Sequence, residues 1–257
     1  MSHAETPREP SHELPAPLSL EAVSAQYQRL LQRLEANERE FRRLGRAVWR
    51  VQEDERRRLA RELHDGLGQN LTALKHRLSQ LAEGLDEDAR IQLDAAIALC
   101  AETLEDTRHL SRLLRPPILD DLGLEPALHW LARSFSESSG VEVVVEVGAL
   151  PALDGELQTL LFRIAQEAFA NAARHAQARS VLLHLDVRGT ELQLQVVDDG
   201  HGFDPGAVAG PGGNDGPGGS GLAGIRERLR LHGGRLELVA APGRGTRLRA
   251  LVPLTAA

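Results

Sequence analysis

A histidine and an aspartate stand side by side in the segment ELHDGLGQ, followed closely by two glycines and a glutamine. His64, Asp65 and Gln69 lie in a stretch, 55–71, that otherwise reads as helix, although each glycine costs about 1 kcal/mol relative to alanine in a helix interior. A neutral imidazole is a competent nucleophile near physiological pH, and the adjacent carboxylate can orient it and act as a general base. At about 100° per residue, Gly68 lies one turn beyond His64, where we expect open space above the imidazole.

Three glycine-bearing motifs stand in the second half of the chain: DDGHGF (198–203), GSGLAGIRER (219–228) and GRGT (243–246). Glycines let backbone N–H groups approach a phosphate, and a helix beginning near Gly221 offers its N-terminus to an anion. Within the expected helix QEAFANAARHA, Asn171 can present an oxygen to Mg²⁺, and Glu167 lies on the same helix face. Asp198 ends an expected strand and can accept a hydrogen bond from an adenine amino group.

Together these motifs resemble those of a known family. The C-terminal half is similar to the ATPase domain shared by gyrase, heat-shock-90, histidine kinases and MutL. The first half resembles the dimerising phosphoacceptor domain of two-component sensor kinases. The segment ERRRLARELHDGLGQNL is similar to the H-box of the nitrate-sensor and DesK-like subfamily, and LRPPILDDLGLEPAL to its linker signature. The resemblance covers about residues 52–257.

The resemblance implies an ATP-dependent protein-histidine kinase. His64 then accepts the γ-phosphoryl group of ATP, and an aspartate in the receiver domain of a response regulator, one with a helix-turn-helix output domain, takes it over. Gln69 is implied to orient water that hydrolyses the regulator's aspartyl phosphate. The candidate catalytic residues are His64, Asp65, Gln69 and Glu167. The candidate nucleotide-binding residues are Asn171, Arg174, His175, Asp198, Gly200, Gly202, Gly219, Gly221, Leu222, Gly243, Gly245 and Thr246. Asn171 and, as a second candidate, Glu167 are the expected contacts of Mg²⁺ bound with ATP.

The N-terminal part shows a seam of apolar residues with alternating steps of three and four. Residues 1–19 lack periodicity, and we expect a disordered tail there. The seam predicts a parallel coiled coil over residues 20–51, with Asn37 as its polar position. The alternative is a single amphipathic helix packed on a globular body, although no nearby segment could cover this face. The seam consists of Leu20, Val23, Tyr27, Leu30, Leu34, Asn37, Phe41, Leu44, Val48 and Val51.

Residues 52–115 are expected to form the dimerisation and histidine phosphoacceptor domain. Leucines from Leu59 to Leu81 form a wider stripe than the seam, and a second helix is expected over about 86–114. Gly84 can end the first helix and Asp86 can cap the second. Because two helices cannot bury both of their faces, we expect a homodimer that forms a four-helix bundle. The change of pattern at Glu55 suggests that a signal acts there by shifting helix register.

Residues 116–257 are expected to form the ATP-binding catalytic domain, an α/β sandwich. We expect strands at 140–147, 180–187, 191–198, 235–239 and 246–253, in an arrangement that reads as antiparallel, and helices at 155–176 and 222–232. The Gly- and Pro-rich stretch 204–219 lies between two nucleotide motifs, which favours a flexible lid over a simple linker.

Composition excludes several other classes of protein. The formal net charge of −7 argues against direct nucleic-acid binding, and the single cysteine excludes an internal disulfide framework. No secretory signal or apolar run of membrane-spanning length is visible, so we expect a cytoplasmic protein. Without a recognisable sensor domain, the input would come through the coil, the tail or an unknown partner. Two rival functions remain: a serine kinase of the anti-sigma-factor type, and a coiled-coil adaptor that binds nucleotide without turnover.

Overall fold

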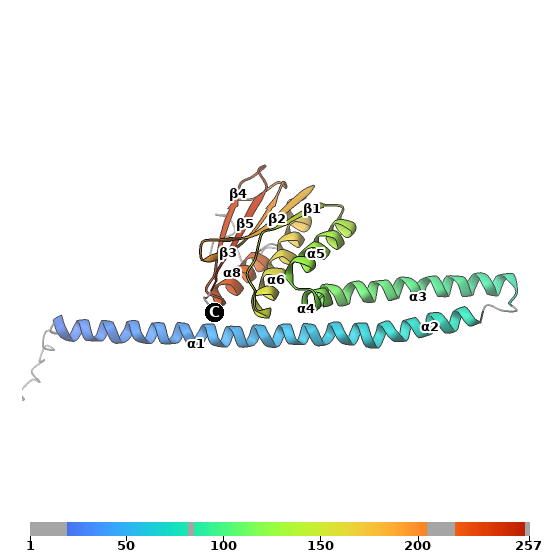
Figure 1. Ribbon diagram of the computed structural model, residues 1–257, viewed down its shortest axis with the longest axis horizontal. Helices are drawn as coiled ribbons and strands as arrows, with labels where there is room; N and C mark the ends of the chain where they lie inside the picture. Colours follow the sequence, from blue (N-terminus) through green and yellow to red (C-terminus); the bar gives the residue numbers. More distant parts are fainter. Residues whose placement is uncertain (1–19, 82–84, 205–218, 255–257) are drawn as a thin grey trace, which may run out of the picture. The chain divides into compact units, whose positions relative to one another are not determined.

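The computed structural model describes residues 20–81, 85–204 and 219–254, so the expected tail and most of the expected lid lie outside the described residues. The chain falls into two units, residues 1–44 and 45–257. The first helix, α1 (Leu20–Arg61), crosses the boundary between them (Figure 1). None of the helices in these described ranges is long and apolar enough to cross a membrane.

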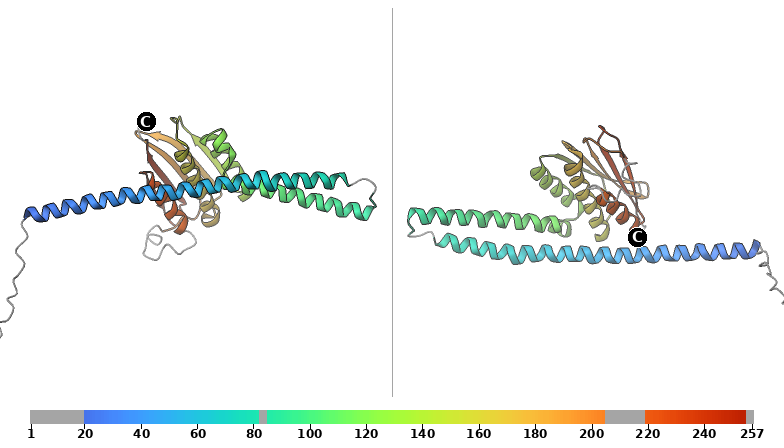
Figure 2. Two further views of the ribbon diagram at one scale, coloured as in Figure 1. Left: turned by 90° about the horizontal axis from the view of Figure 1, so that it is seen from below. Right: turned by 180° about the vertical axis from the view of Figure 1, so that it is seen from behind.

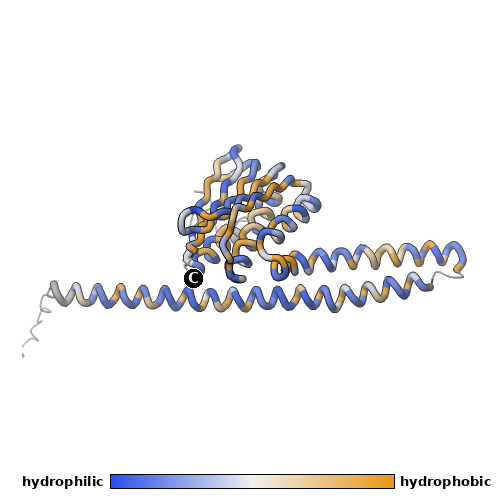
Figure 3. The backbone as a smooth tube through the Cα atoms, in the orientation of Figure 1, coloured by the Kyte–Doolittle hydropathy of each residue, from blue (hydrophilic) through white to orange (hydrophobic). Residues whose placement is uncertain are grey.

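The apolar seam of α1 is exposed. Figure 3 shows hydrophobic residues recurring at intervals along this otherwise hydrophilic helix. The side chains of Leu20 and Val23 lie outside the described residues, and Tyr27 and Phe41 are 62% and 67% exposed. The other exposed apolar members of the seam are Leu30, Leu34, Leu44, Val48 and Val51. Within the described residues nothing covers this stripe, and the coiled coil stays a prediction.

A different face of α1 packs within the second unit, on the end of α8 (Gly219–Leu231). Trp49 is buried, and its ring meets His232 edge to face at 5.2 Å between centroids. The Arg46 Nε donates to the Leu231 carbonyl at 2.6 Å. A Cβ at Gly45 would overlap the Leu231 side chain, so glycine allows this close approach. The helix thus presents one face to its own chain and leaves the seam free.

Three elements continue from α1 and form a helical hairpin: the π-helix η1 (Glu62–Gly68), α2 (Gln69–Gln80) and α3 (Glu87–Leu114). The expected cap is confirmed, because the Asp86 side chain accepts a hydrogen bond from the Ala89 N–H at 2.8 Å. Gly84, the expected helix stop, lies outside the described residues.

Polar contacts fix the two arms of the hairpin against each other. The buried Ser111 hydroxyl donates to the Ala60 carbonyl at 2.8 Å, and the Cys100 thiol donates to the Leu71 carbonyl at 3.3 Å. The outer surface still carries exposed leucines within the single chain, namely Leu59, Leu67, Leu74, Leu81, Leu99 and Leu110. Like the seam, this surface has apolar area that a second copy could cover.

The second half of the chain contains a five-stranded sheet with the order β1-β2-β3-β5-β4. Its strands are β1 (Glu142–Val147), β2 (Ser180–Arg188), β3 (Glu191–Asp198), β4 (Arg235–Ala240) and β5 (Thr246–Pro253). The strand positions agree with the sequence analysis. The expectation of an antiparallel arrangement is wrong at one edge, because β1 pairs with β2 in parallel. The connection between those two strands contains a helix, which is what a parallel pair requires.

Helices cover one face of this sheet and complete the two-layer sandwich (Figures 1 and 2). They are α5 (Leu124–Ser139), α6 (Gly155–Asn171) with the π-helix η2 (Ala172–Ala176), and α8, while α4 (Pro117–Asp121) precedes them. The fully buried Phe162, Phe169 and Leu128 lie in the core between the layers. The sequence analysis missed α5, whose proline, Pro126, lies in the first turn, where a helix tolerates proline.

A buried ion pair joins α1 to α6. The Glu53 carboxylate accepts hydrogen bonds from the Arg163 Nε at 3.0 Å and Nη2 at 2.7 Å, and both side chains are buried. Arg163 also donates to the Leu114 carbonyl at 2.6 Å, at the C-terminus of α3. Burial lowers the pKa of Arg163, and the hydrogen bonds to Glu53 oppose that shift. Three helices therefore meet at one guanidinium.

Removing the carboxylate should destabilise the second unit, because a buried guanidinium would lose its counter-charge. We expect Glu53→Ala to reduce the free energy of unfolding, measured in urea, by about 3 kcal/mol. Glu55→Ala is the matched control, since Glu55 pairs with Arg58 on the exposed side of the same helix, and it should cause no resolvable change. Equal stability of the two variants would contradict a structural role for the ion pair.

Glycines permit a close approach of backbone at the joined ends of β3 and β5. Gly245 has a φ of +67°, and a Cβ there would overlap the Asp198 carbonyl oxygen. Gly202 has a φ of +61°, and a Cβ there would overlap the carbonyl of Ala241. A side chain at either position would push the two loops apart. These glycines are therefore explained by packing against backbone.

Gly245→Ala should lose about 3 kcal/mol of unfolding free energy, because left-handed strain adds to overpacking. Gly155→Ala provides the comparison, since Gly155 begins α6 and has nothing within 4 Å of its added Cβ. That variant should be as stable as the parent chain or slightly more stable. Urea unfolding measures both variants, and a Gly245→Ala chain of unchanged stability would refute the packing explanation.

Candidate functional site

His64 lies in the π-helix η1 and is exposed. Single π-helical turns within longer helices occur often at functional sites. Gly68 is buried and faces α3, but it also borders open space beside His64, as expected, because both residues line one pocket. A Cβ at Gly68 would lie 3.6 Å from the Leu63 carbonyl and 4.0 Å from Leu104.

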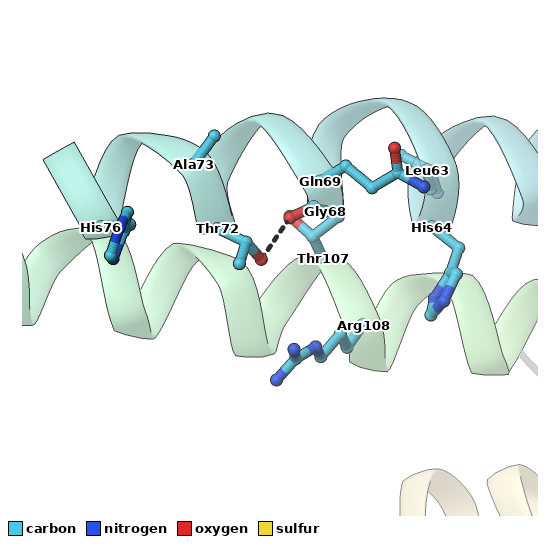
Figure 4. Close-up of a pocket in the computed structure, with 9 residues that line it drawn as sticks. All are labelled: Leu63, His64, Gly68, Gln69, Thr72, Ala73, His76, Thr107 and Arg108. Carbon is cyan, nitrogen blue, oxygen red and sulfur yellow. Dashed lines mark hydrogen bonds between the residues drawn. The ribbon is translucent and has the colours of Figure 1, made fainter.

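The pocket beside His64 has a volume of about 460 Å³. Figure 4 shows its lining residues, which come from η1, α2 and α3. They are Leu63, His64, Gly68, Gln69, Thr72, Ala73, His76, Thr107 and Arg108. Gln69 shares the pocket with His64, whereas Asp65 is exposed and does not line it. Within the described residues no hydrogen bond joins Asp65 to the imidazole, so its role as a base stays a prediction.

A second group of candidate residues gathers at the ends of β3 and β5. The Asp198 Oδ1 accepts hydrogen bonds from the N–H of Gly200 at 3.0 Å and of Thr246 at 3.1 Å. The Gly243 N–H donates to the His201 carbonyl at 2.6 Å. Because Oδ1 is held by backbone, the Asp198 carboxylate has a fixed orientation, and its second oxygen is not needed for these bonds. The DDGHGF and GRGT motifs thus form one structural unit.

A third group lies where α6 faces the start of α8. A Cβ at Gly221 would overlap the Glu167 carboxylate and come within 3.3 Å of the Asn171 Nδ2. This nitrogen is buried and has no hydrogen-bond partner in the described part of the chain. An amide donor without a partner suits a phosphate oxygen, and the oxygen of the same amide suits Mg²⁺. The residues present therefore fit a metal–nucleotide ligand.

The remaining candidate residues lie on, or directly after, the elements that carry these groups. Arg174 and His175 lie on η2, directly after Asn171, and Arg174 is exposed. Gly219 and Leu222 lie in the first turn of α8. Asp199, next to Asp198, accepts hydrogen bonds from the backbone N–H groups of Ser180 and Arg179, and these bonds lower the pKa of its carboxyl group.

Two arginines escaped the sequence analysis. Arg228 lies on α8 near Glu167; burial lowers its pKa, and its Nε is buried without a hydrogen-bond partner in the described ranges. Arg108 lies on α3 and reaches the His64 pocket. Within the sequence both stand in runs of charged residues that are typical of a solvated helix face. Only the packing of helices that are distant in sequence distinguishes these two arginines from those on a solvated helix face.

Among the residues that the structure describes, no group of three or more His, Cys, Asp and Glu side chains could hold a metal ion.

Comparison with protein families gives two matches. A model described as histidine kinase (HisKA_3) matches residues 55–119, which include His64. A model described as histidine kinase-, DNA gyrase B- and HSP90-like ATPase matches residues 156–256, which include Asn171 and Asp198. Together the two matches span more than half of the chain.

Three curated relatives are named as histidine kinases. The chain is 36% identical over 217 residues to the sensor histidine kinase MctS of Rhizobium johnstonii, over 83% of this chain and 46% of that protein. It is 33% identical to the oxygen sensor histidine kinase NreB of Staphylococcus carnosus, over 80% of this chain and 58% of NreB. It is 31% identical to the histidine-protein kinase/phosphatase DegS of Brevibacillus brevis, over 84% of this chain and 56% of DegS. The chain thus spans about half the length of these relatives.

A solved histidine kinase domain, from the blue-light activated histidine kinase of Erythrobacter litoralis EL346, is similar at 19% identity. It has a TM-score of 0.47 and covers 72% of this chain and 94% of that one. The order of the two family matches and the curated relatives show that the chain belongs to the histidine kinases. In these proteins a HisKA_3 phosphoacceptor region is joined to an ATPase domain of the type shared with DNA gyrase B and HSP90.

Proposed function

We propose that this chain is the kinase region of a two-component sensor histidine kinase. It transfers the γ-phosphoryl group of ATP to His64 and then to an aspartate of a response regulator. The observation that supports this most strongly is the exposed His64 beside a pocket, in a chain whose other half belongs to an ATPase family. Domain ranges of 52–115 for the phosphoacceptor region and 116–257 for the ATP-binding region follow from the same proposal.

Each group of candidate residues has a separate role in the proposed reaction. Phosphoryl transfer depends mainly on positioning and on neutralising the charge of the phosphates. Asp198, oriented by its bonds to Gly200 and Thr246, suits recognition of the adenine amino group. Asn171 and Glu167 face the first turn of α8, where the triphosphate would lie. Mg²⁺, when bound with ATP, supplies charge neutralisation at the transferring phosphate.

A homodimer fits the exposed apolar stripes. The seam of α1 and the leucines on the outside of the hairpin leave apolar surface that a second copy would cover. The regulator partner, with a helix-turn-helix output domain, follows from the family resemblance, and the source of the input signal is an unknown partner or ligand. Because the proposed reaction consumes ATP, we propose that this region of the protein lies in the cytoplasm.

Replacing His64 should abolish phosphorylation while leaving nucleotide binding intact. After incubation with γ-labelled ATP and Mg²⁺, the parent chain should carry label that is lost in acid and survives base. His64→Gln should carry none, yet bind ATP with unchanged affinity in a calorimetric titration. His109→Gln is the matched control, because His109 lies on α3 outside the pocket, and it should label normally.

The stability of the label separates the rival functions. Label that is stable in acid and lost in base would contradict the assignment and favour a serine kinase of the anti-sigma-factor type. A parent chain that binds ATP but gains no label would favour a nucleotide-binding adaptor. Retention of label in His64→Gln would remove His64 from the proposed reaction.

We also propose a regulator phosphatase activity that uses Gln69. The relative DegS is named as a kinase/phosphatase, and Gln69 lines the same pocket as His64. A glutamine amide can orient an attacking water. The regulator's receiver domain would therefore be dephosphorylated at the place where it is phosphorylated.

Gln69→Ala should slow dephosphorylation of a labelled receiver domain by about tenfold or more, while labelling of His64 changes little. A suitable receiver is one that accepts the phosphoryl group from the parent chain. Asn70→Ala is the control, since Asn70 is exposed and does not line the pocket. If both variants dephosphorylate the receiver at the parent rate, Gln69 has no part in the reaction.

A further inference from the structure

Among the described residues that line the His64 pocket, Arg108 alone carries a permanent positive charge. It reaches the pocket from α3, while His64 and Gln69 reach it from the other arm of the hairpin (Figure 4). A transferring phosphoryl group carries negative charge on its three outer oxygens. A cation placed beside the accepting imidazole is therefore what the reaction needs.

The guanidinium of Arg108 makes few contacts within the chain. Its partner is Glu105 at 3.5 Å, and no hydrogen bond from Arg108 occurs within the described residues. By contrast, Arg58 donates hydrogen bonds to both Glu55 and Glu62. Most N–H groups of Arg108 are thus available to a ligand.

Two other polar groups of the pocket are already engaged. The Thr72 hydroxyl donates to the Gly68 carbonyl at 2.7 Å, the bond drawn in Figure 4, and the Thr107 hydroxyl donates to the Thr103 carbonyl at 2.8 Å. Since these hydroxyls are tied to their own helices, Arg108 is the strongest donor left to bind an anion in this pocket.

The position of Arg108 around α3 keeps it accessible in a dimer. Arg108 follows Leu99 by nine residues, and at about 100° per residue this puts the two on opposite sides of the helix. Leu99 is 64% exposed and Leu110 is 54% exposed, on the apolar side of α3. A second copy that covers those leucines would leave Arg108 open to ATP and to a receiver domain.

We propose that Arg108 is a catalytic residue that binds the phosphoryl group as His64 receives it. The inference rests on the proposed function. A lone pair on an unprotonated ring nitrogen of His64 forms the new bond to the γ-phosphorus. The bond from that phosphorus to the bridging oxygen breaks, and ADP leaves with its electron pair. The proton on the other ring nitrogen passes to a base or to water. The guanidinium of Arg108 donates two parallel N–H bonds to the outer oxygens, where the negative charge lies.

The matched control is on the next turn of the same helix. Arg112 is 43% exposed at its side chain, against 42% for Arg108, and it pairs with the same Glu105 at 3.6 Å. It does not line the pocket. Arg108→Ala and Arg112→Ala therefore remove the same charge from the same helix and the same ion-pair partner, but only the first changes the pocket.

The test measures kcat and KM for ATP in the labelling of His64 by the full chain. Arg108→Ala should lower kcat by about tenfold or more with KM within about twofold, since the contact forms at the transferring phosphate. Arg112→Ala should stay within about twofold of the parent chain. Arg108→Lys should recover part of the lost rate, and guanidinium ion added at millimolar concentration should accelerate Arg108→Ala but not Arg112→Ala.

Other outcomes would overturn the inference. Equal rates in Arg108→Ala and Arg112→Ala, or a raised KM with unchanged kcat, would show that Arg108 does not act at the transferring phosphate. If Arg108→Ala fails to fold, Arg108→Gln keeps the helix and must show the same loss of kcat. A parent chain without acid-labile label would instead overturn the proposed function, and this inference with it, whereas labelling at the parent rate in Arg108→Ala overturns the inference alone.

Discussion

The arrangement depends on one imidazole that has to be both exposed and fixed. In the proposed reaction, two different partners reach His64 in turn, an ATP-loaded domain and a regulator, so its side chain has to be exposed. Phosphoryl transfer nevertheless requires accurate positioning. The hairpin meets both demands, because the Ser111–Ala60 and Cys100–Leu71 hydrogen bonds fix the backbone behind the histidine. The reactive side then stays open as a pocket that α3 helps to line.

The buried pair of Glu53 and Arg163 connects this hairpin to the ATPase domain. Glu53 lies on α1 eleven residues before His64, which corresponds to about 16 Å along a helix. Arg163 lies on α6, the helix that also carries Glu167 and Asn171, and it binds the last carbonyls of α3 as well. A rotation or shift of α1 would disturb this ion pair. A signal that shifts the register of α1 near Glu55, as the sequence suggests, would therefore act on the Glu53–Arg163 ion pair, which lies two residues away.

Much of the fold follows from local sequence. Strands such as 191–198 alternate between apolar and polar residues, and the carboxylate of Asp86 caps its helix as expected. The parallel pairing of β1 was not predictable, because alternation reports burial and not strand direction. The π-helix around His64 was not predictable either, since no residue type marks the change from i+4 to i+5 bonding.

The sequence also indicated most of the candidate site, but not Arg108 and Arg228. Glycine motifs, Asn171 and Asp198 have recognisable spacing, whereas Arg108 stands among charged residues and gains its meaning only from a neighbouring helix. The central claim is that His64 carries the phosphoryl group, and mapping the labelled peptide at alkaline pH tests it most directly. The account predicts one phosphoryl group per chain, on the ring of His64. A phosphoryl group on a serine, or on His76 in the same pocket, would contradict it.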